Sequence, residues 1–212
     1  MTSDELAHRF LPGAGAGPVF VALHGTGGTP DDLVPVAREL SPDAPVLAPA
    51  GPVSEHGMAR WFRRLAEGVF DTEDVIARTQ QLAGFLQAAR AEHGLGDRPL
   101  VAVGFSNGAN IAAALTLLRP DVLTRAVLFN AMTPVPDPPL LDLTGTYVLL
   151  VNGRRDPMAP TDSAERLVAL LRERSADVQE HWHAGGHQLT VDGLVAAKRW
   201  FAAQMTGLVE PA

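Results

Sequence analysis

The chain has 212 residues, 46% of them hydrophobic, and its 17 Lys and Arg against 24 Asp and Glu give a formal net charge of −7. This length fits one domain with a sizeable core. The acidic balance argues against a nucleic-acid partner or an anionic membrane, because both are bound through basic faces. The lack of cysteine excludes disulfides, thiolate metal sites and a cysteine nucleophile, which leaves seven histidines for acid–base or metal chemistry.

The first residues are acidic and contain no apolar run, so no signal peptide is visible and we expect a cytoplasmic protein. Residues 101–118 carry no charge and approach the length of a membrane span. Polar residues lie in the middle of this stretch, where lipid would leave them without hydrogen-bond partners. We therefore expect no membrane span, and we interpret the stretch as a buried strand, a sharp turn and a buried helix.

Short apolar runs alternate along the chain with longer amphipathic segments. The runs predict strands at 19–24, 45–48, 100–105, 125–129, 147–151 and 178–183, with a further strand near 7–11 ahead of them. The amphipathic segments predict helices at 30–40, 73–93, 107–118, 161–173 and 191–204. The alternation predicts an α/β fold, in which a mostly parallel sheet is flanked by helices on both faces, in a single domain over residues 1–212.

The predicted elements use most of the chain, so we expect no separate lid domain. Two connections, 51–71 and 131–144, are too long for simple turns. Long ordered loops in a compact α/β domain usually wall a site, and the same loops could also be rigid surface connectors.

A G-x-S-x-G motif, Gly104-Phe105-Ser106-Asn107-Gly108, lies between the strand at 100–105 and the helix that follows it. A nucleophilic serine needs a tight strand-to-helix turn of this kind. Glycines on both sides let the neighbouring chain pass close, while the hydroxyl projects above the sheet. The pattern alone could arise in any glycine-rich turn, but its placement favours Ser106 as a nucleophile.

A serine hydroxyl is a weak nucleophile at neutral pH and needs a base, which in turn needs an acidic partner to hold its tautomer. Asp156 lies a few residues after the strand at 147–151, and His187 lies in a glycine-rich loop after the last predicted strand. The order serine, acid, histidine and the position of all three at carboxyl ends of strands suit such a site. Asp137 and Asp142 are rival acids, but they lie inside a proline-rich loop.

Three histidines, His181, His183 and His187, raise the alternative of a metal-dependent hydrolase. Alternating positions on a strand do not by themselves bring three imidazoles together, and no acidic residue follows until Asp192. We therefore expect no metal and no cofactor, and a metal-dependent hydrolase stays open as an alternative of another class.

The glycine-rich segment Leu23-His-Gly-Thr-Gly-Gly follows the first apolar strand. Attack on an acyl carbon creates an oxyanion that preorganised N–H donors must meet. We expect these donors to be the backbone amides of Thr26 and Asn107. A phosphate loop is the competing interpretation, but no lysine follows, and Pro30 stands where a dinucleotide-binding motif needs its last glycine.

Four segments together resemble the bacterial phospholipase/carboxylesterase family of α/β-hydrolases, which is related to acyl-protein thioesterases. They are Leu23-His-Gly-Thr-Gly-Gly, Gly104-Phe-Ser-Asn-Gly-Ala-Asn-Ile-Ala, Asn152-Gly-Arg-Arg-Asp-Pro and Gly186-His-Gln-Leu. The resemblance implies the α/β-hydrolase fold, with Ser106 as the nucleophile, Asp156 as the orienting acid and His187 as the base. Asn107 stands where glutamine is more frequent in the family, which keeps the backbone donor but leaves the substrate open.

Residues 60–71, Arg-Trp-Phe-Arg-Arg-Leu-Ala-Glu-Gly-Val-Phe-Asp, are similar to a segment of the hydroquinone-linked carboxylesterase branch of this family. We expect Trp61 and Phe62 to wall the substrate pocket, while the arginines add local positive charge. The alternative is that the segment only packs its loop onto the sheet. The other expected substrate-binding residues are His24, Gly25 and Met132.

These features predict a carboxylesterase that hydrolyses small carboxylic esters through an acyl-enzyme on Ser106. An acyl thioesterase or a lysophospholipase on the same triad is an alternative, and so is a non-catalytic binding module on the same scaffold. We expect a small-molecule ester as the partner, neither nucleic acid nor a membrane, and we leave a homodimer open.

Overall fold

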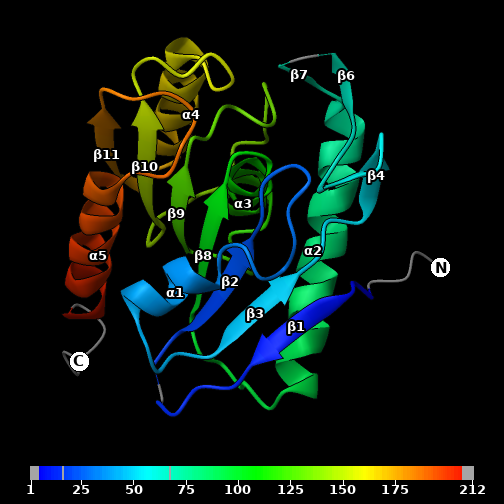
Figure 1. The fold of residues 1–212 in the computed structure, drawn as a ribbon, viewed down its shortest axis with the longest axis vertical. Coiled ribbons are helices and arrows are strands. Elements are labelled where there is room, and N and C mark those ends of the chain that lie inside the picture. Colours follow the sequence, from blue (N-terminus) through cyan, green and yellow to red (C-terminus); the bar gives the residue numbers. More distant parts are fainter. Residues whose placement is uncertain (1–4, 16, 67, 207–212) are drawn as a thin grey trace.

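The computed structural model describes residues 5–15, 17–66 and 68–206. Seven strands of this described part form one sheet in the order β1-β3-β2-β8-β9-β10-β11 (Figure 1). Their bounds are β1 His8–Leu11, β2 Val19–Leu23, β3 Val46–Pro49, β8 Leu100–Phe105, β9 Arg125–Phe129, β10 Tyr147–Gly153 and β11 Asp177–His183. Strand β1 is antiparallel to β3, and the remaining pairs are parallel. The predicted mostly parallel sheet, including the leading strand near 7–11, is therefore confirmed.

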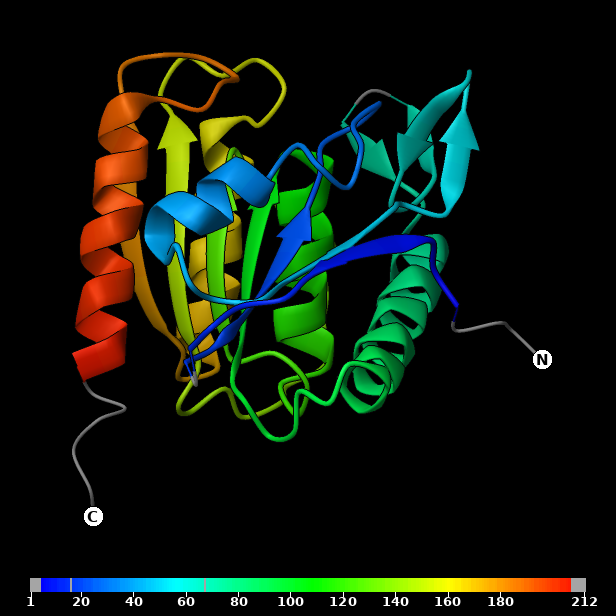
Figure 2. The same cartoon turned by 60° about the horizontal axis from the view of Figure 1, so that its bottom comes forward.

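Helices cover both faces of the sheet, as predicted (Figures 1 and 2). They are α1 Val34–Leu40, α2 Thr72–Glu92, α3 Asn107–Leu118, α4 Thr161–Glu173 and α5 Val191–Thr206. The apolar side chains of α2, α3 and α4 pack on one face, and those of α1 and α5 pack on the other. In β2, Val19, Val21 and Leu23 belong to the first of these clusters, and Phe20 and Ala22 belong to the second. Burial on both faces explains why the predicted strands read as continuous apolar runs.

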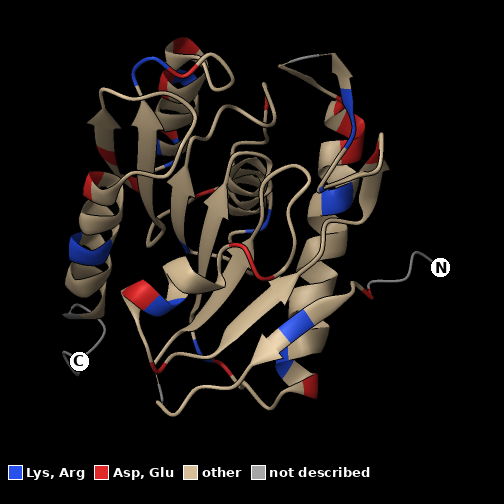
Figure 3. Ribbon diagram, viewed as in Figure 1, with Lys and Arg blue, Asp and Glu red and all other residues tan. Residues whose placement is uncertain are grey.

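Three adjacent strands of the sheet, β3, β2 and β8, carry no acidic or basic residue. Figure 3 shows β2, β3 and β8 uncharged, with charges concentrated on helices and loops. None of the helices in the described part of the chain is both long and apolar enough to cross a membrane. The uncharged stretch 101–118 forms β8, a turn and α3, the arrangement predicted from its polar middle.

Helix α1 is the element that differs most from its prediction, because it begins at Val34 rather than near residue 30. The preceding residues form turns instead, with the Thr29 hydroxyl donating to the Asp32 carboxylate and the Asp32 N–H donating to the Thr29 carbonyl. Short polar side chains compete in this way with the first turn of a helix.

The connection 51–71 contains short strands that apolar periodicity does not predict. Strands β4 Val53–Glu55 and β5 Met58–Arg60 form one antiparallel hairpin, and β6 Arg64–Ala66 pairs antiparallel with β7 Val69–Phe70. Both hairpins lie beyond the carboxyl ends of the parallel strands, beside the start of α2 (Figure 1). They place this connection next to the residues that follow β2 and β8.

The turn between β8 and α3 is sharp, and Ser106 at its centre has φ 54° and ψ −118°. A positive φ in a residue other than glycine is uncommon and costs energy. The glycines on either side make the turn possible, because the neighbouring chain leaves no room for a side chain. A Cβ on Gly104 would lie 2.5 Å from the Gly108 carbonyl oxygen, and one on Gly108 would overlap the Leu23 carbonyl oxygen.

We predict that Gly108→Ala destabilises the protein by about 1–3 kcal/mol, because the new methyl group must push β2 away from α3. Gly17→Ala is the matched control, since a Cβ there meets nothing within 4 Å, and its effect should stay within about 0.5 kcal/mol. Urea unfolding followed by circular dichroism measures both. Equal stability of the two variants would contradict this packing account.

Candidate active site

Three side chains from three different loops meet at the carboxyl ends of β8, β10 and β11. The Nε2 atom of His187 lies 2.8 Å from the Ser106 hydroxyl, and its Nδ1 atom lies 2.7 Å from an Asp156 carboxylate oxygen. Because Nδ1 must donate to the carboxylate, Nε2 keeps a lone pair that can accept the serine proton. The structure thus brings together the three residues that chain order and strand topology selected, in hydrogen-bond geometry.

The Asp156 side chain is fully buried and is held by several donors. One oxygen accepts from the backbone N–H groups of Met158 and Ala159, at 2.8 and 3.0 Å, and the other accepts from His187 and from the Asn130 amide at 2.7 Å. Burial raises the pKa of this carboxyl, but the hydrogen bonds lower it by more, so the pKa lies below its ordinary value. Asp156 is therefore ionised at neutral pH and fixed in orientation.

Asn130 has a role that the sequence interpretation missed. It directly follows β9 with φ 53°, and its amide donates to the Asp156 carboxylate and, at 3.2 Å, to the Gly186 carbonyl. It therefore ties the loop that carries the acid to the loop that carries His187. The sequence did offer a signal for this residue, because Asn130 is a polar residue at the carboxyl end of a predicted strand. Asparagine also tolerates a positive φ better than most residues.

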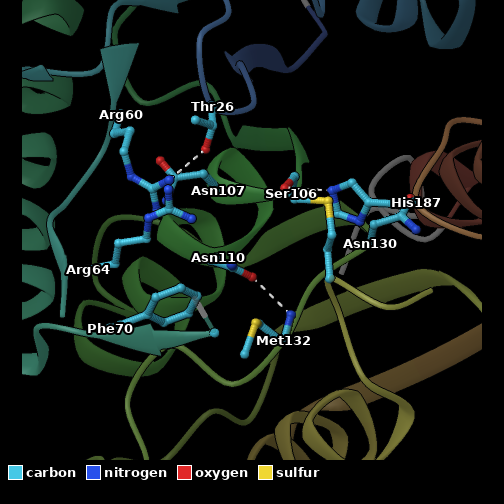
Figure 4. Close-up of a pocket in the computed structure, with 12 residues that line it drawn as sticks. Thr26, Arg60, Arg64, Phe70, Ser106, Asn107, Asn110, Asn130, Met132 and His187 are labelled. Carbon is cyan, nitrogen blue, oxygen red and sulfur yellow. Dashed lines mark hydrogen bonds between the residues drawn. The ribbon is translucent and has the colours of Figure 1, made fainter. Parts of the chain in front are cut away.

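The expected oxyanion donors lie on two segments that meet at Ser106. Thr26 and Asn107 both line the pocket that contains the Ser106 side chain (Figure 4). Asn107 is the first residue of α3, where backbone N–H groups lack partners within the helix. The Thr26 loop is tied to β5 by the hydrogen bond from the Gly27 N–H to the Ala59 carbonyl, at 2.8 Å.

His24 does not line the pocket but holds the loop that contains Thr26 in place. Its buried ring donates from Nδ1 to the Gly25 carbonyl at 2.7 Å and accepts at Nε2 from the Gly51 N–H at 2.9 Å. The Trp61 indole donates to the His24 carbonyl at 2.9 Å. Burial lowers the pKa of His24, and the Gly25 hydrogen bond and the Asp32 charge only partly offset this, so the ring is neutral in the fold.

The expected pocket walls are placed differently from the prediction. Trp61 and Phe62 are 1% and 0% exposed and pack in the core, and the Trp61 N–H donates to the Asn107 side-chain oxygen at 2.7 Å. They anchor their segment, as the packing alternative proposed, because large apolar side chains gain more from full burial. Neither they nor His24 and Gly25 line the pocket, whereas Met132 does.

Other residues of the 60–71 segment line the pocket instead, namely Arg60, Arg64, Gly68 and Phe70. The remaining lining residues are Asn110, Asn130, Met132, Met158 and His187, together with Thr26, Ser106 and Asn107. Figure 4 shows the two arginines beside Thr26 and Asn107, with Phe70 next to Arg64 and Met132 farther from the arginines.

The three histidines considered as metal ligands do not form a cluster. His181 lies near Asp192, His183 accepts from the Gly185 N–H at 3.1 Å, and His187 contacts Ser106 and Asp156. In the described part of the chain, the group with ligand-like spacing is His8, Glu92 and His93, which shares no residue with the pocket at Ser106. The geometry does not favour a metal site at the triad.

We predict that stability falls with pH below about 6.5, because the unfolded chain protonates His24 near its ordinary pKa while the fold resists protonation. One such group contributes a slope of at most about 1.4 kcal/mol per pH unit. Urea unfolding at pH 7.5, 6.5 and 5.5 should show a smaller loss for His24→Gln than for the wild type. An identical loss in both proteins would show that His24 does not cause it.

Comparisons with known proteins place the chain in a family. A sequence model of the phospholipase/carboxylesterase family matches residues 12–204. The chain is 41% identical over 183 residues to the putative hydrolase MhqD of Bacillus subtilis (strain 168), covering 86% of this chain and 92% of that protein.

Two solved carboxylesterases are also similar. That of Bacillus cereus has a TM-score of 0.92 and 41% identity, covering 95% of this chain and 96% of its own. That of Mesorhizobium loti has a TM-score of 0.87 and 29% identity, covering 95% and 97%. The chain belongs to the phospholipase/carboxylesterase family of α/β-hydrolases and is an ester hydrolase.

Proposed function

We propose that this ester hydrolase is a serine carboxylesterase, in which Ser106 is the nucleophile, His187 the base and Asp156 the orienting acid. The observation that carries the proposal is the pair of hydrogen bonds made by one imidazole, at 2.7 Å to the carboxylate and 2.8 Å to the hydroxyl. These contacts lie within the range that a nucleophile and its general base require.

The reaction follows from this arrangement. As the Ser106 oxygen attacks the ester carbon, His187 Nε2 takes its proton, and Asp156 stabilises the imidazolium that forms. The backbone N–H groups of Thr26 and Asn107 receive the oxyanion of the tetrahedral intermediate. Collapse of the intermediate expels the alcohol, which takes the proton from His187 and leaves the acyl group on Ser106. Water, deprotonated by the same histidine, then releases the acid and restores the serine.

The size of the pocket supports small esters as substrates. Its volume is about 40 Å³, and Phe70, Met132 and Met158 supply its apolar surface. A short acyl group suits this space better than the long chain of a lysophospholipid. An acyl thioester would pass through the same steps, so a thioesterase on this triad would differ only in the leaving group.

The buried carboxylate favours an enzyme over a binding module on the same scaffold. A non-catalytic module would have no need for a carboxylate that three other donors hold in contact with a histidine that also contacts a serine. We propose a small-molecule ester as the partner. The cytoplasmic location and the assembly state stay predictions.

We predict that Ser106→Ala and Asp156→Asn each lower kcat/KM for short p-nitrophenyl esters by about a thousandfold or more, because each removes a member of a unit that acts together. Asp142→Asn is the matched control, since Asp142 is exposed and accepts from its neighbour Thr144. It should keep wild-type activity. Undiminished turnover by Ser106→Ala would contradict the serine mechanism, and loss of activity in Asp142→Asn alone would reassign the acid.

A further inference from the structure

We propose that Arg60 and Arg64 form an anion-binding subsite beside Ser106, so that the preferred substrates are esters that also carry a carboxylate. This inference rests on the proposed function and adds to it the charge of the substrate. It starts from the two guanidinium groups that line the same pocket as the serine (Figure 4).

The two arginines are held in place by the loops around them. Arg60 is 4% exposed, and it donates from Nη1 to the Thr26 hydroxyl at 3.0 Å and from Nε to the Phe62 carbonyl at 3.3 Å. Arg64 donates from Nε to a Glu55 carboxylate oxygen at 2.9 Å. The other Glu55 oxygen lies 3.1 Å from Arg60 Nε. A guanidinium held in this way loses little freedom when a ligand binds.

Both arginines pair with the same carboxylate, that of Glu55. The hydrogen bond from Arg64 lowers the pKa of Glu55, and burial offsets this only in part, so Glu55 is ionised at neutral pH. Asp156 does not line the pocket, and its oxygens are taken up by the donors around it. The described residues that line the pocket therefore include two guanidinium groups and no carboxylate, in a chain whose net charge is −7.

Asn107 adds a hydrogen-bond donor to the same wall. Its side chain is 3% exposed, and its oxygen accepts from the Trp61 N–H, which fixes the orientation of the amide. The amide nitrogen is buried and has no hydrogen-bond partner among the described residues. A buried donor without a partner is costly, and a ligand oxygen would relieve that cost.

The apolar residues of the pocket indicate the rest of the substrate. Phe70, Met132 and Met158 line the pocket with apolar surface, so the pocket combines apolar side chains with cationic and amide donors. Such a lining favours an ester whose apolar part lies between the reacting carbonyl and an anionic end. A carboxylate matches the planar fork of a guanidinium and can accept two hydrogen bonds from it.

Matched pairs of esters test the proposal. The first pair, 4-acetoxybenzoate and 4-acetoxybenzamide, places the carboxylate on the alcohol side. The second pair, mono-4-nitrophenyl adipate and its terminal amide, places it on the acyl side. The readout is the ratio of kcat/KM for the anionic ester to that for its amide partner. We expect a ratio of at least about ten in one pair, the scale of one charge-assisted hydrogen bond, and the pair that shows it identifies the side.

Variants link the ratio to the arginines. Arg64→Gln should bring the ratio toward one, and Arg64→Lys, which keeps the charge but not the fork, should give an intermediate ratio. Arg199→Gln is the matched control, because it removes the same charge from an exposed position on α5 and should keep the wild-type ratio. In the wild type, 0.5 M NaCl should lower the ratio, because salt screens an ionic contact, and this arm needs no variant to fold.

The outcomes separate this inference from the function on which it rests. Ratios near one in both pairs, with all esters hydrolysed, would overturn the anion subsite and leave the esterase intact. A high ratio that survives both Arg64→Gln and added salt would overturn the assignment to the arginines. No hydrolysis of any of the esters would contradict the proposed function and this inference together.

Discussion

The strained backbone of Ser106 is the constraint on which the rest of the site depends. With φ at 54° the residue lies outside the regions that most side chains prefer. The fold keeps it there because close contacts hold both β8, which precedes it, and α3, which follows it. The close contacts at Gly104 and Gly108 and the hydrogen bond from the Ser106 N–H to the Phe129 carbonyl, at 2.9 Å, hold the turn. The same turn lifts the hydroxyl toward His187 and places the first N–H groups of α3 beside it.

The histidine depends on a second fixed element, the buried carboxylate of Asp156. Its hydrogen bonds from backbone and Asn130 would be lost together if the loop after β10 moved. A carboxylate with its oxygens satisfied cannot rotate to another partner, so it sets the tautomer and the plane of the imidazole. The geometry of the proposed catalytic residues is therefore fixed by backbone contacts at the ends of β8, β9 and β10, and little of it depends on flexible surface side chains.

Much of this arrangement could be predicted from the sequence because it is encoded locally. Strands β2, β3 and β8 are uncharged, mostly apolar runs buried on both faces, and the G-x-S-x-G motif marks its own strand and helix. Chain order then selects Asp156 and His187. What escaped prediction depends on packing between distant segments. Trp61 and Phe62 read as pocket walls, yet they lie in the core and leave the wall to Arg60 and Arg64. Asn130 belongs to no sequence motif that would indicate its contacts, because its partners Asp156 and Gly186 lie far along the chain.

The most direct test of the central claim is to react the protein with a fluorophosphonate and map the modified peptide by mass spectrometry. A serine activated by a positioned base reacts with this probe, whereas ordinary serines do not. We predict one adduct, on Ser106, with a rate that falls by at least about a hundredfold in His187→Gln, the scale of a general base. No adduct, an adduct on another serine, or an unchanged rate in His187→Gln would contradict it.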